Sequence, residues 1–327
     1  MAPVGGSREL GLADFARLQR LAATGSTARL FREFEAAGIR LLLLKGLSLQ
    51  RWLYADGAPR PSGDLDLLVS PADFEHAERL LTRLGFVSRH DGAAPAWAQE
   101  HADSWQSLEW PLPIDLHRRL WGIEEHPQVA FDLLWAAHAS IEVGGQPVQI
   151  LGEAARALLV ALHVAHHGTG FSRPMEDLRR AIAQVPSETW ADARQTAEEV
   201  GALASLSLGL SLVASGSALR QQLGLTDARA PNATETPLAW TLPMTGEGFV
   251  RIRRAQSLGE KLRLLRREAV PSIAFMRVQS AEQALARRGR RGLTLAYTVR
   301  VVRLLRHVKP GLRAARDEYG SARPDGR

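Results

Sequence analysis

The chain has 327 residues, of which 45% are hydrophobic and 23% charged, proportions that are ordinary for a globular protein with a sizeable core. It has no cysteine, which excludes disulfide bonds, thiolate metal sites and a cysteine nucleophile. The net charge of +6 is uneven, because residues 251–327 hold 20 Lys and Arg against 6 Asp and Glu. This excess favours an acidic partner, such as nucleic acid, anionic lipid or another protein, or else a solvated arginine-rich tail.

Two segments bear on export and membrane insertion. Residues 1–10 lack the apolar segment of a signal peptide, so we expect a cytoplasmic protein. The uncharged stretch Val200–Leu219 is long enough to cross a bilayer. Its many Ser, Ala and Gly residues make it only weakly apolar, which favours a buried, tightly packed helix over a membrane span.

The first part of the chain alternates predicted helices with short predicted strands. Helical periodicity predicts a helix over 8–38, closed by Gly38. The apolar run Ile39–Leu44 predicts a buried strand, and Leu47–Tyr54 predicts another helix. A cluster of turn-forming residues, Asp56–Gly63, predicts a loop.

More strands follow this loop. Asp64–Val69 is predicted as a strand and Pro71–Leu84 as a helix, with Ser70 as its N-cap and Pro71 in its first position. Alternating apolar residues between turns predict five further short strands, at Phe86–Arg89, Trp105–Trp110, Ile114–His117, Ser140–Val143 and Pro147–Ile150. Gly144-Gly145 between the last two predicts a hairpin.

From Glu153 onward helical periodicity replaces the strand signals, so we place a domain boundary near residue 150. The predicted fold class is α/β (α+β) with a mixed sheet, followed by an all-helical C-terminal domain. The predicted parts are an α/β domain with an N-terminal helix over 1–150, a helical domain over 151–225, a loop or linker over 226–248, a basic helical region over 249–319 and a frayed tail over 320–327.

Two aspartates share one face of a predicted strand. Alternate side chains of Asp64–Val69 point the same way, so Asp64 and Asp66 lie together while Leu65 and Leu67 point into the core. Two neighbouring acids repel each other and are costly to bury, and a bound cation removes that cost. Oxygen ligands suit Mg²⁺ or Mn²⁺.

A third aspartate has a similar setting. Asp115 alternates with apolar residues in Ile114–His117, and His117 shares its face. If this strand pairs beside the first, three carboxylates converge as two-metal phosphoryl transfer requires. Paired aspartates at a strand edge also occur as turn caps or as a solvated rim. The third aspartate, and the strand and helix joined by Lys45-Gly46, favour the metal site.

The order of these segments resembles a known superfamily. The run ending in Lys45-Gly46, the motif RPSGDLDLLV over 60–69, the helix ending before Gly85-Phe86 and the later IDLH over 114–117 are similar to nucleotidyltransferases with the DNA polymerase beta-type fold. They resemble more closely a bacterial group of nucleotidyltransferases with the pattern lKG…RP.GDiDllv…Gf…iDlH. The stretch ALHVAHHGTGFSRPMEDLRRAI over 161–182 resembles the helical half of that group, and the resemblance covers about residues 30–185.

The resemblance implies a role for each of the three aspartates. Asp64 and Asp66 match the paired metal ligands of the superfamily. Asp115 matches its third carboxylate, which ligates metal and can act as a base toward the acceptor hydroxyl. All three are therefore expected to be both catalytic and metal-binding, with Mg²⁺ or Mn²⁺ as the ion and an NTP as substrate.

The resemblance also implies a nucleotide-binding set. Gly46 matches the glycine at the start of a helix, where backbone N–H groups meet the triphosphate. Lys45 and Arg60 are expected to supply cations to the phosphates. The Gly-Ser pair that is usual in the superfamily is absent, because Leu47 follows Gly46. Ser48, one residue further on, is the candidate for the missing hydroxyl.

Four histidines and one further aspartate are candidates for the acceptor side of the site. His163, His166 and His167 lie on roughly one face of a predicted helix, but the His-Glu-x-x-His motif of metal sites is absent. A structural role, with a ring nitrogen bonded to Asp177, and a place on the acceptor side both stay open for them. Asp177 is also a candidate helix cap. His117 either contacts phosphate or the acceptor, or is a strand histidine with satisfied hydrogen bonds.

The predicted function is that of a Mg²⁺-dependent nucleotidyltransferase, which moves a nucleoside monophosphate from an NTP such as ATP to a hydroxyl-type acceptor. The resemblance implies a setting in natural-product or polysaccharide biosynthesis. One alternative is a toxin-like transferase that acts on tRNA or a protein, favoured by the basic C-terminal helices. Another is a non-catalytic scaffold or binding protein, motivated by the missing Gly-Ser pair. The acceptor stays open among a small molecule, a peptide and RNA.

Overall fold

The structure is a computed structural model of the whole chain. It describes residues 12–58, 60, 62–88, 102–226, 258–259, 262, 266, 270, 273–278, 283–303 and 305. The predicted linker over 226–248, apart from Thr226, and the predicted tail over 320–327 lie outside these residues.

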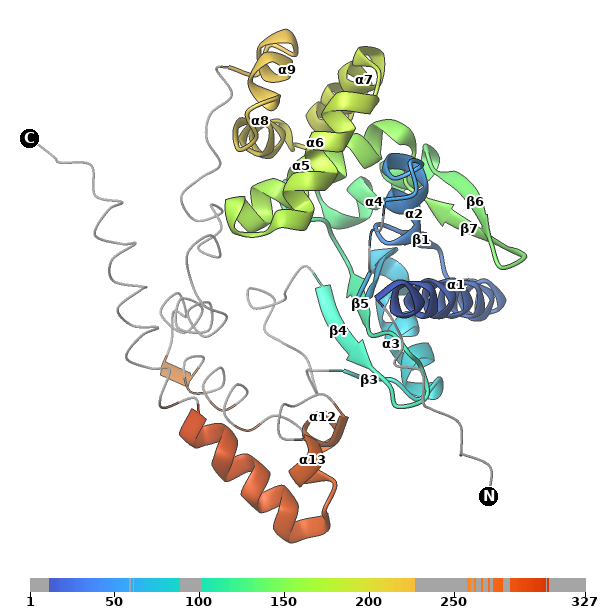
Figure 1. Ribbon diagram of the computed structural model, residues 1–327, viewed down its shortest axis with the longest axis vertical. Coiled ribbons are helices and arrows are strands. Elements are labelled where there is room, and N and C mark those ends of the chain that lie inside the picture. Colours follow the sequence, from blue (N-terminus) through green and yellow to red (C-terminus); the bar gives the residue numbers. More distant parts are fainter. Residues whose placement is uncertain are drawn as a thin grey trace, which may run out of the picture.

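The centre of the structure is a seven-stranded sheet with the strand order β3-β4-β5-β2-β1-β7-β6 (Figure 1). The strands are β1 (Leu41–Leu43), β2 (Leu65–Val69), β3 (Val87–Ser88), β4 (Ala102–Gln106), β5 (Ile114–His117), β6 (Ala139–Val143) and β7 (Gln146–Ile150). Strand β2 runs parallel to β5 and antiparallel to β1, while β1 runs parallel to β7. The sheet is therefore mixed and is followed by helices, which confirms the predicted fold class.

The register of the sheet brings acidic residues together. Strands β2 and β5 pair so that Asp66 is the direct partner of Asp115. On the other side of β5, Ser104 of β4 is also a direct partner of Asp115. Strands β2 and β5 are therefore paired side by side, as convergence of the carboxylates requires.

Helices cover both faces of the sheet. Leu65 and Leu67 of β2 pack in a cluster that includes Phe34 of α1 (Leu12–Ala36) and Leu81 of α3 (Phe74–Arg83). Leu68 packs in the opposite cluster, against α4 (Pro127–Ala136) and α5 (Glu153–His167). Because alternate residues of a strand share a face, Asp66 points to the same side as Leu68.

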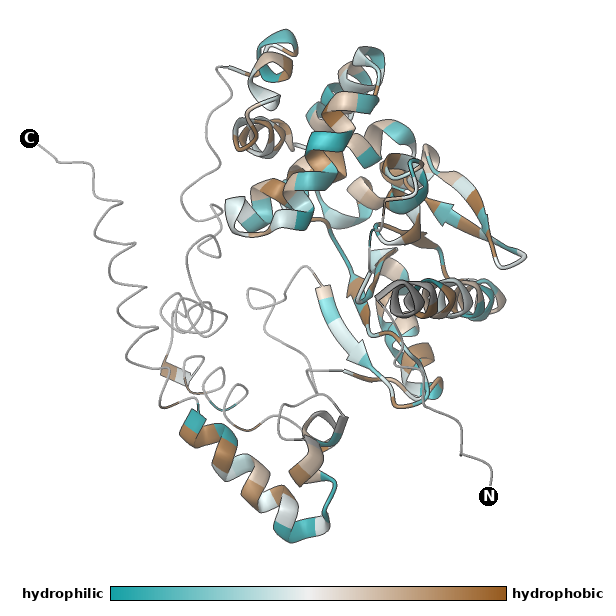
Figure 2. Cartoon of the chain, viewed as in Figure 1, coloured by the Kyte–Doolittle hydropathy of each residue, from teal (hydrophilic) through white to brown (hydrophobic). Residues whose placement is uncertain are grey.

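A bundle of helices follows the sheet and packs around α5. It consists of α6 (Ser172–Gln184), α7 (Ser187–Glu199), α8 (Leu203–Ser211) and α9 (Gly216–Gln222), and α5 contacts the first three. Leu159 of α5 belongs to the cluster on the sheet, whereas Leu158 and Leu162 belong to the cluster inside the bundle. Colouring by hydropathy shows mixed apolar and polar segments along α5 and α7, as expected of helices that bury one face (Figure 2). Strands give way to helices after β7, and α5 packs in both parts, while the domain boundary near residue 150 stays a prediction.

The described C-terminal part is helical. Helices α12 (Ile273–Val278) and α13 (Gln283–Ala286) precede a helix over 289–303, and α12 contacts β3. Met276, Ala286 and Ala296 form a small apolar cluster of their own.

Two helix predictions hold only in part. Ser70 is the N-cap residue and Pro71 begins the helical segment after it, but the Ser70 side chain makes no capping bond; its hydroxyl accepts from Arg40 Nη2 at 3.2 Å and donates to Gln128 Oε1 at 3.3 Å. The chain after it forms a 3₁₀ turn, η1 (Pro71–Asp73), before α3 begins.

The stretch Val200–Leu219 is not one helix either. It is divided into α8 and α9 by a turn, and Gly216 packs so closely that a Cβ there would lie 2.1 Å from the Leu210 carbonyl oxygen. Within the described residues, no helix is both long and apolar enough to cross a membrane.

The contact between α5 and α8 depends on Gly209. A Cβ at this position would lie 2.1 Å from the Ala161 carbonyl oxygen of α5. We expect Gly209→Ala to force the helices apart and to lower the free energy of unfolding by about 1–3 kcal/mol. The control is Gly25→Ala in α1, where nothing lies within 4 Å, and it should be neutral or stabilising by about 0.5–1 kcal/mol. Urea denaturation measures both, and similar shifts in the two variants would contradict close packing at Gly209.

Candidate active site

A cleft of about 480 Å³ lies where the sheet meets α5 and α6. Residues next to and within the central strands line one part of it, namely Lys45, Arg60, Ser62, Asp64, Asp66 and Asp115. Residues from the end of α5 and the start of α6 line the rest, namely His163, His167, Phe171, Ser172, Arg173 and Pro174. The cleft therefore combines the predicted carboxylates with basic and aromatic side chains.

Asp66 carries the most strongly bonded carboxylate of the cleft. Its Oδ1 lies 2.7 Å from Lys45 Nζ and 3.3 Å from His117 Nε2, and its side chain is 6% exposed. Burial alone would raise the pKa of Asp66, but the Lys45 ammonium and the bond with His117 outweigh it and hold the pKa well below the ordinary value. Asp66 is thus ionised at neutral pH and paired with a cation.

Asp64 has the opposite electrostatic setting. Burial raises its pKa, and the negative charges of Asp66 and Asp115 raise it further, to about 6. Lys45 and Arg173 offset only part of this effect. The cleft therefore holds excess negative charge around Asp64.

Asp115 is oriented by a neighbouring strand. Ser104 donates a hydrogen bond to Asp115 Oδ1 at 2.5 Å, across the β4–β5 pairing. A hydroxyl that donates to one carboxylate oxygen fixes the rotation of the group. Asp115 therefore presents a defined orientation to the cleft.

The guanidinium of Arg60 is paired with the buried carboxylate of Asp177. Its Nε and Nη2 donate to the two oxygens of Asp177 at 2.9 and 2.7 Å, and Tyr54 donates its hydroxyl proton to Asp177 Oδ1 at 2.7 Å. The Asp177 side chain is 0% exposed and lies within α6, away from the helix start. Asp177 therefore positions Arg60, an arrangement that does not favour the expected acceptor contact or a capping role for it.

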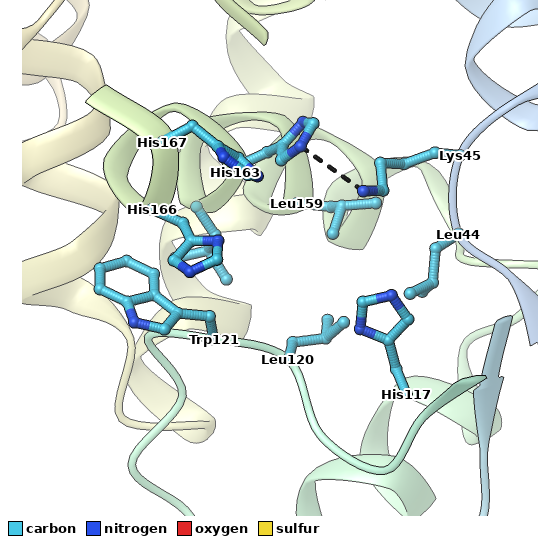
Figure 3. Close-up of a pocket in the computed structure, with 10 residues that line it drawn as sticks. Leu44, Lys45, His117, Leu120, Trp121, Leu159, His163, His166 and His167 are labelled. Carbon is cyan, nitrogen blue, oxygen red and sulfur yellow. Dashed lines mark hydrogen bonds between the residues drawn. The ribbon is translucent and has the colours of Figure 1, made fainter. Parts of the chain in front are cut away.

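Helix α5 ends at the cleft with three histidines. His163 and His167 line the cleft, and with His117 and His166 they also line a smaller adjoining cavity of about 50 Å³ (Figure 3). Trp121 stacks on His166 with the ring centroids 5.2 Å apart. Burial, reinforced by nearby positive charge, lowers the pKa of His163 well below its ordinary value, that of His166 to about 3 and that of His167 to about 4. These imidazoles are therefore neutral at pH 7, and each offers one donor and one acceptor.

The family model of uncharacterised nucleotidyltransferases matches residues 13–215, which is more than half of the chain. The chain belongs to this family. It is accordingly a transferase of the nucleotidyltransferase type, as the resemblance implied. No curated protein matches the sequence.

Three solved structures share a distant similarity with this nucleotidyltransferase. The antibiotic-resistance factor ANT(2'')-Ia is 13% identical over 56% of this chain and 94% of its own, with a TM-score of 0.40. A nucleotidyltransferase-like protein of Paracoccidioides brasiliensis is 13% identical over 56% and 90%, with a TM-score of 0.33. A tRNA nucleotidyltransferase bound to a primer tRNA and an ATP analogue is 12% identical over 89% and 98%, with a TM-score of 0.24. All three TM-scores are below 0.5, so the assignment rests on the family match.

Part of the expected nucleotide-binding set does not reach the cleft of this nucleotidyltransferase. Ser48 is 1% exposed, and its hydroxyl has no hydrogen-bond partner among the described residues. Gly46 adopts φ +61°, and a Cβ there would lie 3.3 Å from Ser62 Oγ. Ser62 lines the cleft and donates to the Asp64 carbonyl oxygen at 2.9 Å. The hydroxyl next to Gly46 therefore comes from the loop before β2 rather than from Ser48.

Several residues that shape the site could not be assigned from the sequence. Ser104 was missed because β4 begins at Ala102, whereas the predicted strand began at Trp105. Phe171 and Arg173 lie in the stretch that resembles the family's helical half, but only the fold shows that they reach the cleft. Ser62 stands inside the RPSGDLDLLV motif, and its place in that motif was the available signal.

The carboxylate oxygens of the cleft are suitable ligands for a hard cation such as Mg²⁺. Asp64, Asp66 and Asp115 offer oxygen ligands, and burial together with the negative charges of Asp66 and Asp115 raises the pKa of Asp64. Within the described part of the chain, no group of three or more His, Asp or Glu side chains is close enough to enclose a metal ion. Mg²⁺ commonly binds through one or two carboxylates plus substrate phosphates, so this open arrangement suits an ion that arrives with a nucleotide.

The buried Arg60–Asp177 pair is expected to support the stability of the site. Asp177→Ala would leave the guanidinium, which is 4% exposed, without its counter-ion, and should lower the free energy of unfolding by about 3–5 kcal/mol. The control is Asp56→Ala, because Asp56 pairs with Arg180 at 2.9 Å but is 57% exposed, and it should change stability little. Urea denaturation compares the two, and a small effect of Asp177→Ala would contradict the role of the pair.

The raised pKa of Asp64 predicts that this residue lowers the free energy of unfolding more at neutral pH than at low pH. A carboxyl whose pKa rises on folding favours the folded state at low pH, and this contribution is lost as the pH rises through about 6. We expect Asp64→Asn to raise the free energy of unfolding by about 1–3 kcal/mol at pH 7.5 and to have little effect at pH 4. Urea denaturation of wild type and variant at both pH values measures the difference. An equal effect at the two values would rule out the pKa shift.

Proposed function

We propose that this nucleotidyltransferase transfers a nucleoside monophosphate from an NTP to a hydroxyl-type acceptor in a reaction that depends on Mg²⁺ or Mn²⁺. The observation that carries the proposal is the convergence of Asp64, Asp66 and Asp115 from adjacent strands on one cleft that also holds Lys45 and Arg60. A metal-bound triphosphate requires carboxylates that bind the metal ion and basic side chains that offset the phosphate charge.

The reaction forms one bond and breaks another at the α-phosphorus. The acceptor oxygen bonds to it, while the bond to the oxygen that bridges to the β-phosphate breaks and pyrophosphate leaves with the electron pair. Asp115, oriented by Ser104, takes the proton of the acceptor hydroxyl. A bound divalent cation would lower the pKa of that hydroxyl and stabilise the leaving pyrophosphate.

The basic side chains of the cleft offset the charge of the triphosphate. Lys45 and Arg173 line the cleft directly. Arg60 lines it as well and is held in one orientation by the bidentate contact with Asp177. A guanidinium fixed in this way loses little further freedom when it binds phosphate, which supports a role in placing the nucleotide.

The neutral imidazoles support an uncharged acceptor. His163 and His167 line the cleft and stay unprotonated at neutral pH, so they can exchange hydrogen bonds with hydroxyl groups. A cleft of about 480 Å³ lies within the range of small-molecule sites. We therefore favour a small hydroxyl compound, acted on in the cytoplasm during natural-product or polysaccharide biosynthesis.

One feature supports transfer to RNA as a second candidate. Four exposed arginines, Arg287, Arg288, Arg290 and Arg291, lie within five residues at the start of the helix over 289–303. A basic surface of this kind attracts phosphate backbones. Binding of tRNA that weakens steeply between 50 and 200 mM salt, on the order of 10³-fold or more, would favour this candidate.

The first test is calorimetric titration of each NTP into the protein, with Mg²⁺ and with a chelator. We expect one NTP to bind only when Mg²⁺ is present, and Asp64→Asn to abolish that binding. The control is Asp132→Asn, because Asp132 is exposed, pairs with Arg40 and does not line the cleft. A protein that binds no NTP under either condition would instead be a non-catalytic scaffold.

Transfer itself is measured with an NTP labelled at the α-phosphate in a cell extract. Asp115→Asn should lower incorporation of label by about 10²–10⁴-fold, because it removes the proton acceptor, while NTP affinity changes much less. Label in nuclease-sensitive product would identify RNA as the acceptor. Label in small, nuclease-resistant product would identify a small molecule.

A further inference from the structure

Two metal ions that each bound two of the three carboxylates would need one carboxylate in common. Asp66 would be this shared ligand, and it would bridge the two ions. Asp66 lies two residues after Asp64, which immediately precedes β2, and directly beside Asp115 on the neighbouring strand. A bridging role would require both of its oxygens, one for each ion.

One of these oxygens is already bonded within the protein. Asp66 Oδ1 lies 2.7 Å from Lys45 Nζ and 3.3 Å from His117 Nε2. These two contacts engage both lone pairs of Oδ1, so a Mg²⁺ ion could bind this oxygen only by displacing Lys45 or His117. The positive charge of Lys45 would repel it as well.

Lys45 is fixed where it makes this contact. The backbone N–H of the preceding residue, Leu44, donates to the Asp66 carbonyl oxygen at 3.0 Å, so the two chain segments are joined by backbone and side chain. The Lys45 side chain is 16% exposed, and its Nζ also lies 3.5 Å from His163 Nε2 (Figure 3). Movement of Lys45 away from Asp66 would leave a buried carboxylate without its closest cation.

We infer that the Lys45 ammonium takes the place of a second metal ion, and that this nucleotidyltransferase works with a single divalent cation. The inference rests on the proposed function. It leaves Asp64, Asp115 and the other oxygen of Asp66 as the carboxylate oxygens from which that ion, arriving with the nucleotide, would take one or two ligands.

The charges of the site agree with one ion. The three carboxylates carry three negative charges, and Lys45 with one divalent cation carries three positive charges. Two divalent cations beside Lys45 would carry five. Arg173 adds one more positive charge to the same cleft, so a single ion leaves less excess positive charge beside the carboxylates than two ions would.

The test counts Mn²⁺ ions per chain by electron paramagnetic resonance, with the protein alone and with a saturating NTP analogue that has a methylene group between the α- and β-phosphates. We expect wild type with the analogue to bind one Mn²⁺. Lys45→Met, which keeps the length of the side chain but removes its charge, should bind two. Two ions about 3.5–4 Å apart also interact magnetically, so the Lys45→Met spectrum should be broadened.

Two further variants serve as a substitute and as a control for this count of bound ions. Lys45→Ala replaces Lys45→Met if that variant does not fold, as judged by circular dichroism. Arg40→Met removes a positive charge that does not line the cleft, and it should still bind one Mn²⁺.

The outcomes separate this inference from the proposed function. Two Mn²⁺ ions in wild type would overturn the inference and leave the proposed function standing. One ion in both wild type and the Lys45 variants would also overturn it, because Lys45 would not be what excludes the second ion. No bound Mn²⁺ in wild type, with or without the analogue, would remove the proposed function and the inference together.

Discussion

The parallel pairing of β2 with β5 is the constraint on which the site depends. Its register sets Asp66 beside Asp115, and the alternation of side chains along β2 sets Asp64 on the same face. A shift of one residue would turn Asp66 into the apolar layer that now holds Leu65 and Leu67. The strong burial of these leucines on the opposite face therefore also fixes the direction in which the carboxylates point.

This geometry gathers negative charge that the protein only partly neutralises. Lys45 stabilises Asp66, while Asp64 is left in a setting that disfavours its charged form. Negative charge that is only partly neutralised lowers the free energy of unfolding of the free protein, and binding of a cation raises it again. The neutral histidines of α5 extend the same cleft without adding charge, so one continuous surface offers an anionic part and a neutral polar part.

Much of this arrangement could be predicted from sequence, because strand alternation and the RPSGDLDLLV motif are local signals. The placing of Asp64 and Asp66 on one face and the hairpin at Gly144-Gly145 needed no knowledge of distant contacts, whereas the pairing of Asp66 with Asp115 could only be stated as a condition. The environment of Asp177 could not be predicted, since its partner Arg60 lies 117 residues away and only the packing of α6 brings them together. Ser48 was a poor candidate for a similar reason, because its burial depends on the helices that cover α2 (Leu47–Leu53).

The Arg60–Asp177 pair also limits how the cleft can open. Together with Tyr54, it ties the loop before β2 to α6, and separation of these segments would expose an ion pair that is almost completely buried. A hinge motion between the sheet and the helical bundle would therefore be slow and rarely populated. Phe171, which lines the cleft with its side chain 52% exposed, belongs to the side of the cleft that this pair ties to the loop before β2. The fixed shape of the cleft, rather than a closing motion, would then limit the size of the molecules that it admits.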